Sequence, residues 1–292
     1  MLDQLANGIL FGAIIAMTSV GLSLIFNVAG AFNFAHGDLV TLGSMMAVLF
    51  ATTVGLPVWL SIVLAVVAGG AAGLLLDFTV FRPLRRAGAG GITLLVTTLG
   101  LALIIRYAIL AVAGPEAKAL PLPPQHVTPY FGLRFTPLAL VVIVSTIVIL
   151  VAFGILLAKS RLGVAMRAVA SNGTLAAASG VDIERIITIT WVLGGALAAT
   201  GGVMLALTQL VYWDMGFQLL LLMFAGIIVG GLGSPFGAML GGFVIGLIAQ
   251  LAVTLPYVRE HNDLKISVAL LVLVAVLLLR PQGILGRKAR LS

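Results

Sequence analysis

Residues 159–187 read KSRLGVAMRAVASNGTLAAASGVDIERII and separate two long apolar segments. This stretch carries four basic residues, Lys159, Arg161, Arg167 and Arg185, and it is the longest run without an apolar segment of membrane-spanning length. The apolar runs around it reach about 20 residues, which is the length that a helix needs to cross a bilayer core. The pattern therefore indicates helices that cross a membrane, joined by polar connections.

The composition supports the same fold class. Of the 292 residues 61% are apolar and only 9% are charged, whereas a soluble domain carries about 25% charged residues. We predict an all-α polytopic membrane protein with eight or nine hydrophobic segments, at least one broken or re-entrant, forming a single transmembrane domain over residues 1–292. The candidate segments are approximately 6–26, 38–54, 57–80, 92–113, 137–158, 187–211, 217–232, 236–255 and 264–280.

The basic residues predict an orientation. Eleven of the sixteen lie in three connections separated by even numbers of segments, and lysine and arginine accumulate on the cytoplasmic side. We therefore expect these connections, and the C-terminus, in the cytoplasm, and the net charge of +7 reflects membrane orientation and not nucleic-acid binding. The three sets are Arg82, Arg85, Arg86; Lys159, Arg161, Arg167, Arg185; and Arg280, Arg287, Lys288, Arg290.

The second segment begins with GAFNFAHGDLVTLGS, in which Asn33, His36 and Asp38 lie within six residues. Polar groups at membrane depth are costly and usually face a cavity or a partner, and the surrounding glycines permit a broken helix. One interpretation is a gate or translocation path, and the other is an interfacial helix start capped by Asn33. One histidine and one aspartate supply too few ligands for a metal ion, so we predict no metal site.

Arg106 lies inside the apolar stretch TLGLALIIRYAILAVAG. An arginine within a membrane segment is a functional candidate. We favour a structural role, in which the side chain reaches an interface or pairs with an acid such as Asp77. Asp77 itself is near the end of its segment and could instead face the basic Arg82–Arg86 cluster. Asp182 and Glu184 are expected to be solvated.

Glycine-rich segments recur at 69–73, 194–202 and 226–246. In the last, the pairs Gly237/Gly241 and Gly242/Gly246 have the spacing that lets two helices approach closely. The break near Ser234 and Pro235 is of the kind found near transport pathways. The alternative is helix packing without a transport role.

Within the 159–186 connection, Asn172 is a plausible helix cap and Gly180 a plausible helix stop. They predict a short helix between two membrane segments. It is either a docking element for a cytoplasmic motor protein or a solvated basic loop that only sets the topology. The three histidines lie far apart in sequence, and the chain contains no cysteine, so no catalytic constellation is evident.

Three motifs carry a resemblance: GLSLIFNVAGAFNFAHGDLVTLG with its NFAHG core, SRLGVAMRAVASNGTLAAASGVDIERIITITWVLGGALAATGGVM, and GGLGSPFGAMLGG followed by RPQGILG. In them the chain resembles the LivH-type permeases of ATP-binding-cassette (ABC) importers for branched-chain amino acids, and the related urea and short-chain amide permeases. The resemblance implies a permease subunit of a bacterial inner-membrane importer that works by alternating access. It binds no cofactor itself, because ATP is used by a partner ATPase.

The resemblance also implies the partners: a second permease subunit, LivM-like or homologous, two cytoplasmic ATPases, an extracytoplasmic substrate-binding protein and the lipid bilayer. It places six residues in the segment that couples ATPase motion to the pore: Arg161, Gly163, Arg167, Asn172, Ala177 and Gly180. The alternative function is an ion-driven secondary transporter or channel, in which Arg106, Asp38 or His36 would couple ion and solute movement.

Overall fold

The chain was analysed as a computed structural model, which describes residues 2–30, 32–130, 133–261, 264–280 and 282–286. The first half contains α1 (Leu2–Ala29), α2 (His36–Thr52), α3 (Val58–Leu76), the π-helical turn η1 (Asp77–Phe81), α4 (Arg82–Arg86), α5 (Gly91–Ala113), β1 (Thr128–Tyr130) and β2 (Leu133–Phe135). The second half contains α6 (Pro137–Lys159), α7 (Arg161–Ser171), α8 (Gly173–Ala178), α9 (Ile183–Thr208), α10 (Met215–Gly230), α11 (Pro235–Ala252), α12 (Pro256–Glu260) and α13 (Leu264–Leu279).

Each of the nine predicted apolar segments is a helix. Among the described residues, six helices are long and apolar enough to cross a bilayer, with α3 continuing through α4, and α10 and α13 are shorter apolar helices. The prediction of an all-α polytopic membrane protein is confirmed. α1 ends at Ala29, and α2 is continuous from His36 to Thr52. The predicted break or re-entry of the second segment stays a prediction.

The chain groups into two compact units, described separately below. Unit 1 consists of residues 1–23, 122–150 and 221–292, and unit 2 of residues 24–121 and 151–220. Unit 1 contains α11, α12, α13 and the β1–β2 hairpin with most of α1 and α10, and unit 2 contains α2 to α5 and α7 to α9.

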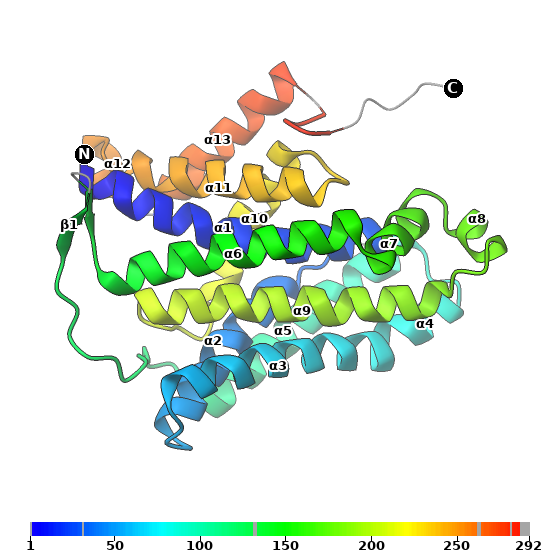
Figure 1. Cartoon of the computed structure of the whole chain (residues 1–292), viewed down its shortest axis with the longest axis horizontal. Coiled ribbons are helices and arrows are strands. Elements are labelled where there is room, and N and C mark those ends of the chain that lie inside the picture. Colours follow the sequence, from blue (N-terminus) through cyan, green and yellow to red (C-terminus); the bar gives the residue numbers. More distant parts are fainter. Residues whose placement is uncertain (1, 31, 131–132, 262–263, 281, 287–292) are drawn as a thin grey trace. The chain divides into compact units, whose positions relative to one another are not determined.

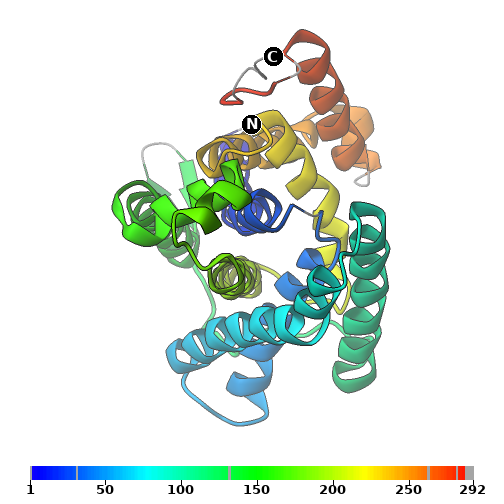
Figure 2. The ribbon, with the colours of Figure 1, turned by 90° about the vertical axis from the view of Figure 1, so that its right-hand side faces the viewer.

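The core of unit 2 is a three-helix contact in which α9 packs against α2 and α3 (Figures 1 and 2). Ala199 of α9 lies so close to Gly43 of α2 and Gly69 of α3 that a Cβ on either glycine would overlap it. A Cβ on Gly202 would likewise overlap the carbonyl of Val40. Lipid provides little hydrophobic drive between helices, so such close approach of small residues is what holds them.

Unit 1 uses its glycines in the same way. Gly237 and Gly241 of α11 face the α10 backbone at Gly230 and Gly226. On the next faces of α11, a Cβ on Gly242 would lie 2.9 Å from Ala16 Cα, and one on Gly246 would lie 2.7 Å from Gly12 Cα of α1. These four predicted packing residues therefore join α11 to two neighbours, α10 and α1.

Residues 282–286, the end of the RPQGILG motif, are bound to the C-terminal end of α10. The backbone N–H of Ile284 donates to Val229 O at 2.8 Å, and that of Leu285 donates to Gly230 O at 2.9 Å. Gly283 and Gly231 both have positive φ, of 74° and 109°, and they lie in close backbone contact. Arg287, Lys288 and Arg290 lie outside the described residues.

Two local predictions need correction, and one local element was not predicted. Arg82, Arg85 and Arg86 lie not in a loop but on α4, because the helix continues past Leu76 through η1. The 159–186 connection contains two helices and not one, because Ser160 caps α7 by accepting a hydrogen bond from Gly163 N at 3.0 Å. The connector after α5 contains the unpredicted hairpin, in which Thr128 pairs with Phe135.

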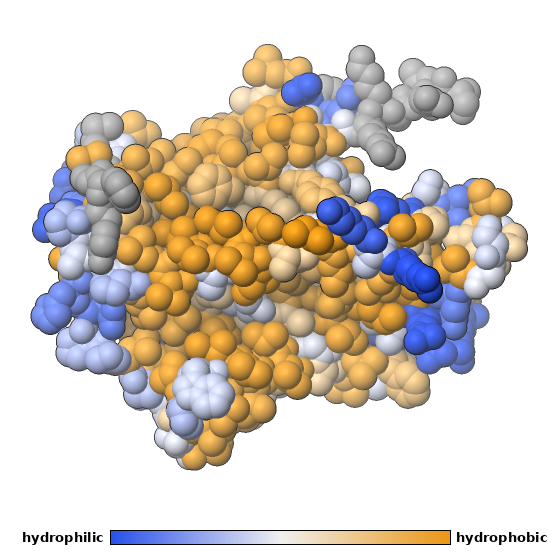
Figure 3. Space-filling model, in the orientation of Figure 1, coloured by the Kyte–Doolittle hydropathy of each residue, from blue (hydrophilic) through white to orange (hydrophobic). Residues whose placement is uncertain are grey.

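The surface of unit 2 separates by polarity along its helices. Apolar side chains cover most of the visible length of α3 beyond its first turns, and hydrophilic ones gather at its α4 end and on α7 (Figure 3). On α3, Trp59, Val63 and Val67 are between 52% and 68% exposed, which a helix facing water would not tolerate in series. The apolar length of α3 therefore faces lipid or another membrane protein.

Candidate functional site

The polar start of α2 is held by local hydrogen bonds. Gly30 adopts a φ of 71°, a left-handed conformation that suits glycine and ends α1. The Asn33 side-chain oxygen then accepts from Ala35 N at 3.1 Å, and His36 N donates to Asn33 O at 3.2 Å. Asn33 therefore shapes the turn before α2, although it is Ala35 that occupies the cap position.

All three predicted polar residues of this turn are buried, with Asn33, His36 and Asp38 each 0% exposed. The Asn33 amide nitrogen has no hydrogen-bond partner among the described residues. A buried amide donor without a partner costs about 1–3 kcal/mol. Such a donor is retained where water or a ligand satisfies it in another state, so it marks this turn as a candidate site.

Asp38 forms a two-pronged ion pair with Arg106 in the middle of α5. The Arg106 Nε lies 3.0 Å from Asp38 Oδ1 and its Nη2 lies 3.2 Å from Oδ2. Arg106 is 8% exposed, and its guanidinium carbon lies 3.6 Å from the centre of the Phe217 ring. The guanidinium of Arg106 is thus contacted by the carboxylate of Asp38 and by the ring of Phe217. A buried charge requires such a partner, because one left unpaired is strongly destabilising.

The sequence suggested Asp77 as an acidic partner of Arg106, and this prediction is wrong. The turn before α2 lies beside α5, where Thr98 Oγ1 donates to Phe32 O at 3.1 Å. Arg106 is two turns further along α5 and reaches the first turn of α2. Asp77 instead binds Arg85, one of the nearby basic residues, with an Nη1–Oδ1 distance of 2.7 Å.

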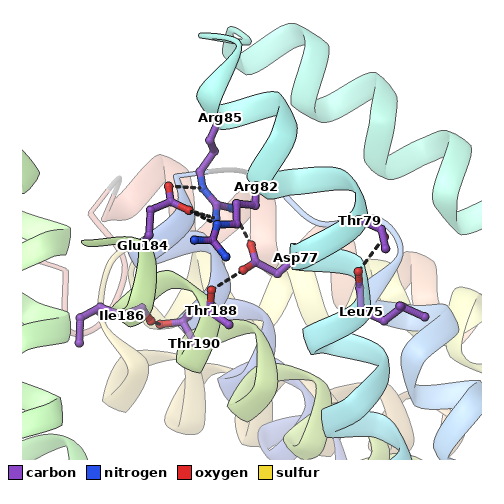
Figure 4. A network of polar contacts seen from close by, with 9 residues as sticks. All are labelled: Leu75, Asp77, Thr79, Arg82, Arg85, Glu184, Ile186, Thr188 and Thr190. Atoms are coloured by element: carbon purple, nitrogen blue, oxygen red, sulfur yellow. Dashed lines mark hydrogen bonds and ion pairs between the residues drawn. The ribbon is translucent and has the colours of Figure 1, made fainter. Parts of the chain in front are cut away.

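A second polar cluster joins the α3–α4 end to the first turns of α9 (Figure 4). Glu184 lies 3.2 Å from both Arg82 Nε and Arg85 Nη2, and Thr188 Oγ1 donates to Asp77 Oδ2 at 2.6 Å. Glu184 is therefore not simply solvated as expected, and Asp182 caps α9 by accepting from Arg185 N at 3.1 Å. The cluster fixes the helix that follows the 159–186 connection.

The turn η1 lies within this cluster. π-Helical turns are rare and are often found at functional sites. The ring of Phe81 in η1 stacks on Trp191 of α9 at a centroid distance of 4.3 Å, and Gly73 of α3 is in tight contact with the Trp191 backbone. Ion pairs, a stacked ring and a glycine contact thus connect α3, η1 and α4 to α9 as one joint.

The six residues assigned to coupling divide into exposed and structural positions. Gly163 is buried against the Leu157 backbone, and the exposed Arg167 donates to Leu157 O. Asn172 caps α8 by accepting from Leu175 N at 2.9 Å, and Gly180 stops it with a φ of 84°, as predicted. Arg161 and Ala177 are exposed.

The exposed face of this connection is partly apolar. Val164 of α7 is 54% exposed and Leu175 of α8 is 64% exposed. Val164 lies between Arg161 and Arg167 on the same side of α7, since it is three residues from each. The α7–α8 pair therefore offers a surface of mixed apolar and basic character, and only Gly163, Met166, Val169 and Ala176 are buried on it.

Residues 4–279 match the family described as the permease component of the branched-chain amino acid transport system. The chain belongs to this family. It is 29% identical over 300 residues to the permease protein BraD of Pseudomonas aeruginosa and 30% identical to LivH of Escherichia coli, both high-affinity branched-chain amino acid transport system permeases. Each alignment covers 98% of this chain and 96% of the relative.

The fold is also found in the solved structure of PsaBC from Streptococcus pneumoniae in complex with Fab. The TM-score is 0.50 at 13% identity, and the match covers 98% of this chain and 92% of that chain. The protein is therefore a transport permease and a multi-pass membrane protein, as the motifs had implied. Among the described residues no group of three or more metal-binding side chains occurs.

Several residues of the permease site were not found from sequence. Glu184 contacts Arg85 across 99 positions, and Phe217 of α10 contacts Arg106 of α5. A single sequence contains no signal for such distant contacts. The contacts of Gly43 with Ala199 and of Gly202 with Val40, which join α2 to α9, also have no signal in the sequence. The glycine-rich stretches at 69–73 and 194–202 were noted, but their partner on α2 was not.

Proposed function

We propose that this permease is a pore-forming subunit of an ABC importer for branched-chain amino acids, driven by a separate cytoplasmic ATPase that docks on α7 and α8. The observation that carries the proposal is the α7–α8 pair itself. It consists of two short capped helices between two long apolar ones, with exposed basic and apolar side chains. A loop that only set topology would need the charges but neither the caps nor the exposed Val164 and Leu175.

The polar joint supports a coupling role for this connection. α9 follows α8 directly, and its first turns are tied to α4 through Glu184 and to Asp77 through Thr188. A displacement of α8 would therefore act on α9, and through the joint on the α3–α4 segment. In this proposal ATP binding to the partner ATPase shifts the population of inward- and outward-open states of the permease. The basic connections and the C-terminus lie on the cytoplasmic side.

The partners in the proposal are a second permease subunit, two ATPases and an extracytoplasmic binding protein that delivers the amino acid. The relatives BraD and LivH carry branched-chain amino acid transport in their names, and the substrate is proposed on that ground. The alternative of an ion-driven secondary transporter predicts transport by this chain alone.

The docking proposal is tested by affinity purification of the tagged permease with its partners from mild detergent. We expect Arg161→Ala and Arg167→Ala to lose most of the co-purifying ATPase, since each removes an exposed charge. Asn172→Ala should weaken binding because a lost cap costs about 1 kcal/mol of helix stability, and Asn172→Asp, which keeps the cap, should restore it. Arg259→Ala, an exposed arginine outside the connection, is the matched control.

Retention of the ATPase in every variant would contradict docking at α7–α8 but leave the importer intact. Uptake by the purified chain alone in liposomes, with no ATPase present, would contradict the importer and favour the secondary transporter. The first outcome tests where the ATPase docks, and the second tests whether the permease belongs to an ATP-driven importer.

We further propose that Asn33, His36 and Asp38 line or gate the path, with Arg106 holding Asp38 in place. The support is the buried amide of Asn33, which lacks a partner among the described residues and could bind a passing solute or water. Asn33→Ala and His36→Ala should each lower ATP-driven leucine uptake about tenfold, equivalent to about 1.4 kcal/mol in the barrier, with the ATPase still bound. Gln125→Ala, in an exposed loop, is the control, and unchanged uptake in both site variants would contradict the gate.

A further inference from the structure

A groove with a volume of about 530 Å³ runs through unit 2 between α2, α3 and α5. All but three of its lining side chains are Ala, Val, Leu, Ile or Met. Several of them are open to the outside, since Leu75 is 62%, Ile104 is 66% and Val112 is 79% exposed. The groove is therefore an accessible apolar surface in the membrane-spanning part of the chain, and the path residues Asn33, His36, Asp38 and Arg106 are not among its lining.

The polarity of the groove changes along its length. Its three polar lining residues are Thr52, Thr53 and Lys118, which lie where α2 ends and shortly after α5 ends. α2 and α5 run side by side in the same direction, because Phe32 meets Thr98 and Asp38 meets Arg106. The polar residues therefore gather at one end, and the rest of the groove is apolar.

The length of the groove follows from the helix rise. Along α2 the lining extends from Leu39 to Thr53, which at 1.5 Å per residue is about 21 Å. The hydrocarbon of one leaflet is about 15 Å thick, half of a 30 Å core. Its apolar part, from Leu39 to Leu49, is about 15 Å long. This length matches a lipid chain in one leaflet, whereas a single amino acid would occupy only a fraction of it.

Lys118 is a fixed cation at the polar end. Its backbone N–H donates to Val211 O at 2.9 Å, and its carbonyl accepts from Val211 N at 2.8 Å, so the position of its Cα is set. No ion pair of Lys118 is present among the described residues. An ammonium group above an apolar groove attracts an anion that is itself joined to an apolar chain.

We propose that this groove binds one phospholipid, with an acyl chain along α2, α3 and α5 and the headgroup phosphate on Lys118. The groove has a cation at one end and an apolar lining along the rest, and a phospholipid has an anionic phosphate at one end and a hydrocarbon chain along the rest. A transmembrane helix of a partner subunit would fill the apolar part, but it would cover Lys118 with apolar surface and leave the charge without a counter-ion. The proposal does not depend on the substrate or on the ATPase.

The test uses the permease with its partner subunits in liposomes that contain phosphatidylglycerol carrying a photoreactive diazirine in one acyl chain. After irradiation, the attached lipid is located by mass spectrometry of the digested protein. We expect attachment at groove residues such as Met45 and Ile109. Lys118→Gln should reduce it about fivefold, the effect of removing one lysine near the membrane surface, and Lys118→Arg should retain it.

A second pair of variants separates the groove from general lipid contact. Ala108→Trp places a large side chain in the groove and should abolish attachment there, whereas Ala111→Trp is the same change at an exposed alanine of α5 outside the lining. Equal attachment along all exposed helices, unchanged by Lys118→Gln and Ala108→Trp, would overturn the proposal. Displacement of the lipid by excess leucine would also overturn the proposal. Cross-linking of a photoreactive group at position 108 to a partner helix instead of lipid would do the same.

Discussion

Replacing Arg106 with methionine is expected to lower the free energy of unfolding of the permease by about 3–5 kcal/mol, because it leaves the carboxylate of Asp38 buried without its counter-charge. Asp38 is 0% exposed, and both of its carboxylate oxygens are bound by Arg106. The measurement is reversible unfolding in mixed micelles, followed by tryptophan fluorescence. Arg106→Lys keeps the charge but loses the two-pronged contact with Asp38 and the stacking on Phe217. We therefore expect an intermediate loss of the free energy of unfolding.

The matched test of this pair is a double-mutant cycle. Asp38→Asn alone should also destabilise, because it leaves the Arg106 charge unpaired. The double variant Asp38→Asn/Arg106→Met contains no buried charge, and its loss should be smaller than the sum of the two single losses. Simple addition of the two losses would show that the ion pair contributes nothing beyond its separate side chains and would contradict this reading of the site.

The second large effect is expected at the junction of α2, α3 and α9. Gly43→Val should lower the free energy of unfolding by about 1–3 kcal/mol or more, because overpacking a tight contact forces the backbone apart. The new Cβ would overlap Ala199, which also contacts Gly69, so the change would loosen two helix pairs. Thermal unfolding of the purified permease measures the loss, and the ATPase pull-down reports whether the α9 end is still in place.

Gly100→Val is the control, since a Cβ at Gly100 of α5 meets no atom within 4 Å. It introduces the same β-branched residue into a helix, so the intrinsic helix preference is matched. Ala199→Gly combined with Gly43→Val should recover little of the loss, because the new Cβ overlaps the Cα and carbonyl oxygen of Ala199 as well as its methyl group, and both backbone atoms remain in glycine. Equal destabilisation by the two valine variants would indicate that helix preference, and not packing at Ala199, determines the cost.

Properties that depend on neighbouring residues in the chain were predictable. The nine apolar segments, the membrane class, the Asn172 cap and the Gly180 stop all follow from short windows of sequence. Apolar length and helix capping are local, because each depends on residues within a few positions. The family could also be identified from sequence, since NFAHG and the 160–204 motif lie in continuous stretches.

Properties that depend on which helices lie side by side were decided by the tertiary structure alone. Arg106 pairs with Asp38 across 68 positions, and Arg85 meets Glu184 across 99. The same holds for Ala199 between Gly43 and Gly69, and for the groove that ends at Lys118. A membrane helix presents apolar residues on all its faces, so its sequence contains little information on its neighbours. Only the packed structure shows which buried charge, glycine or cavity another helix completes.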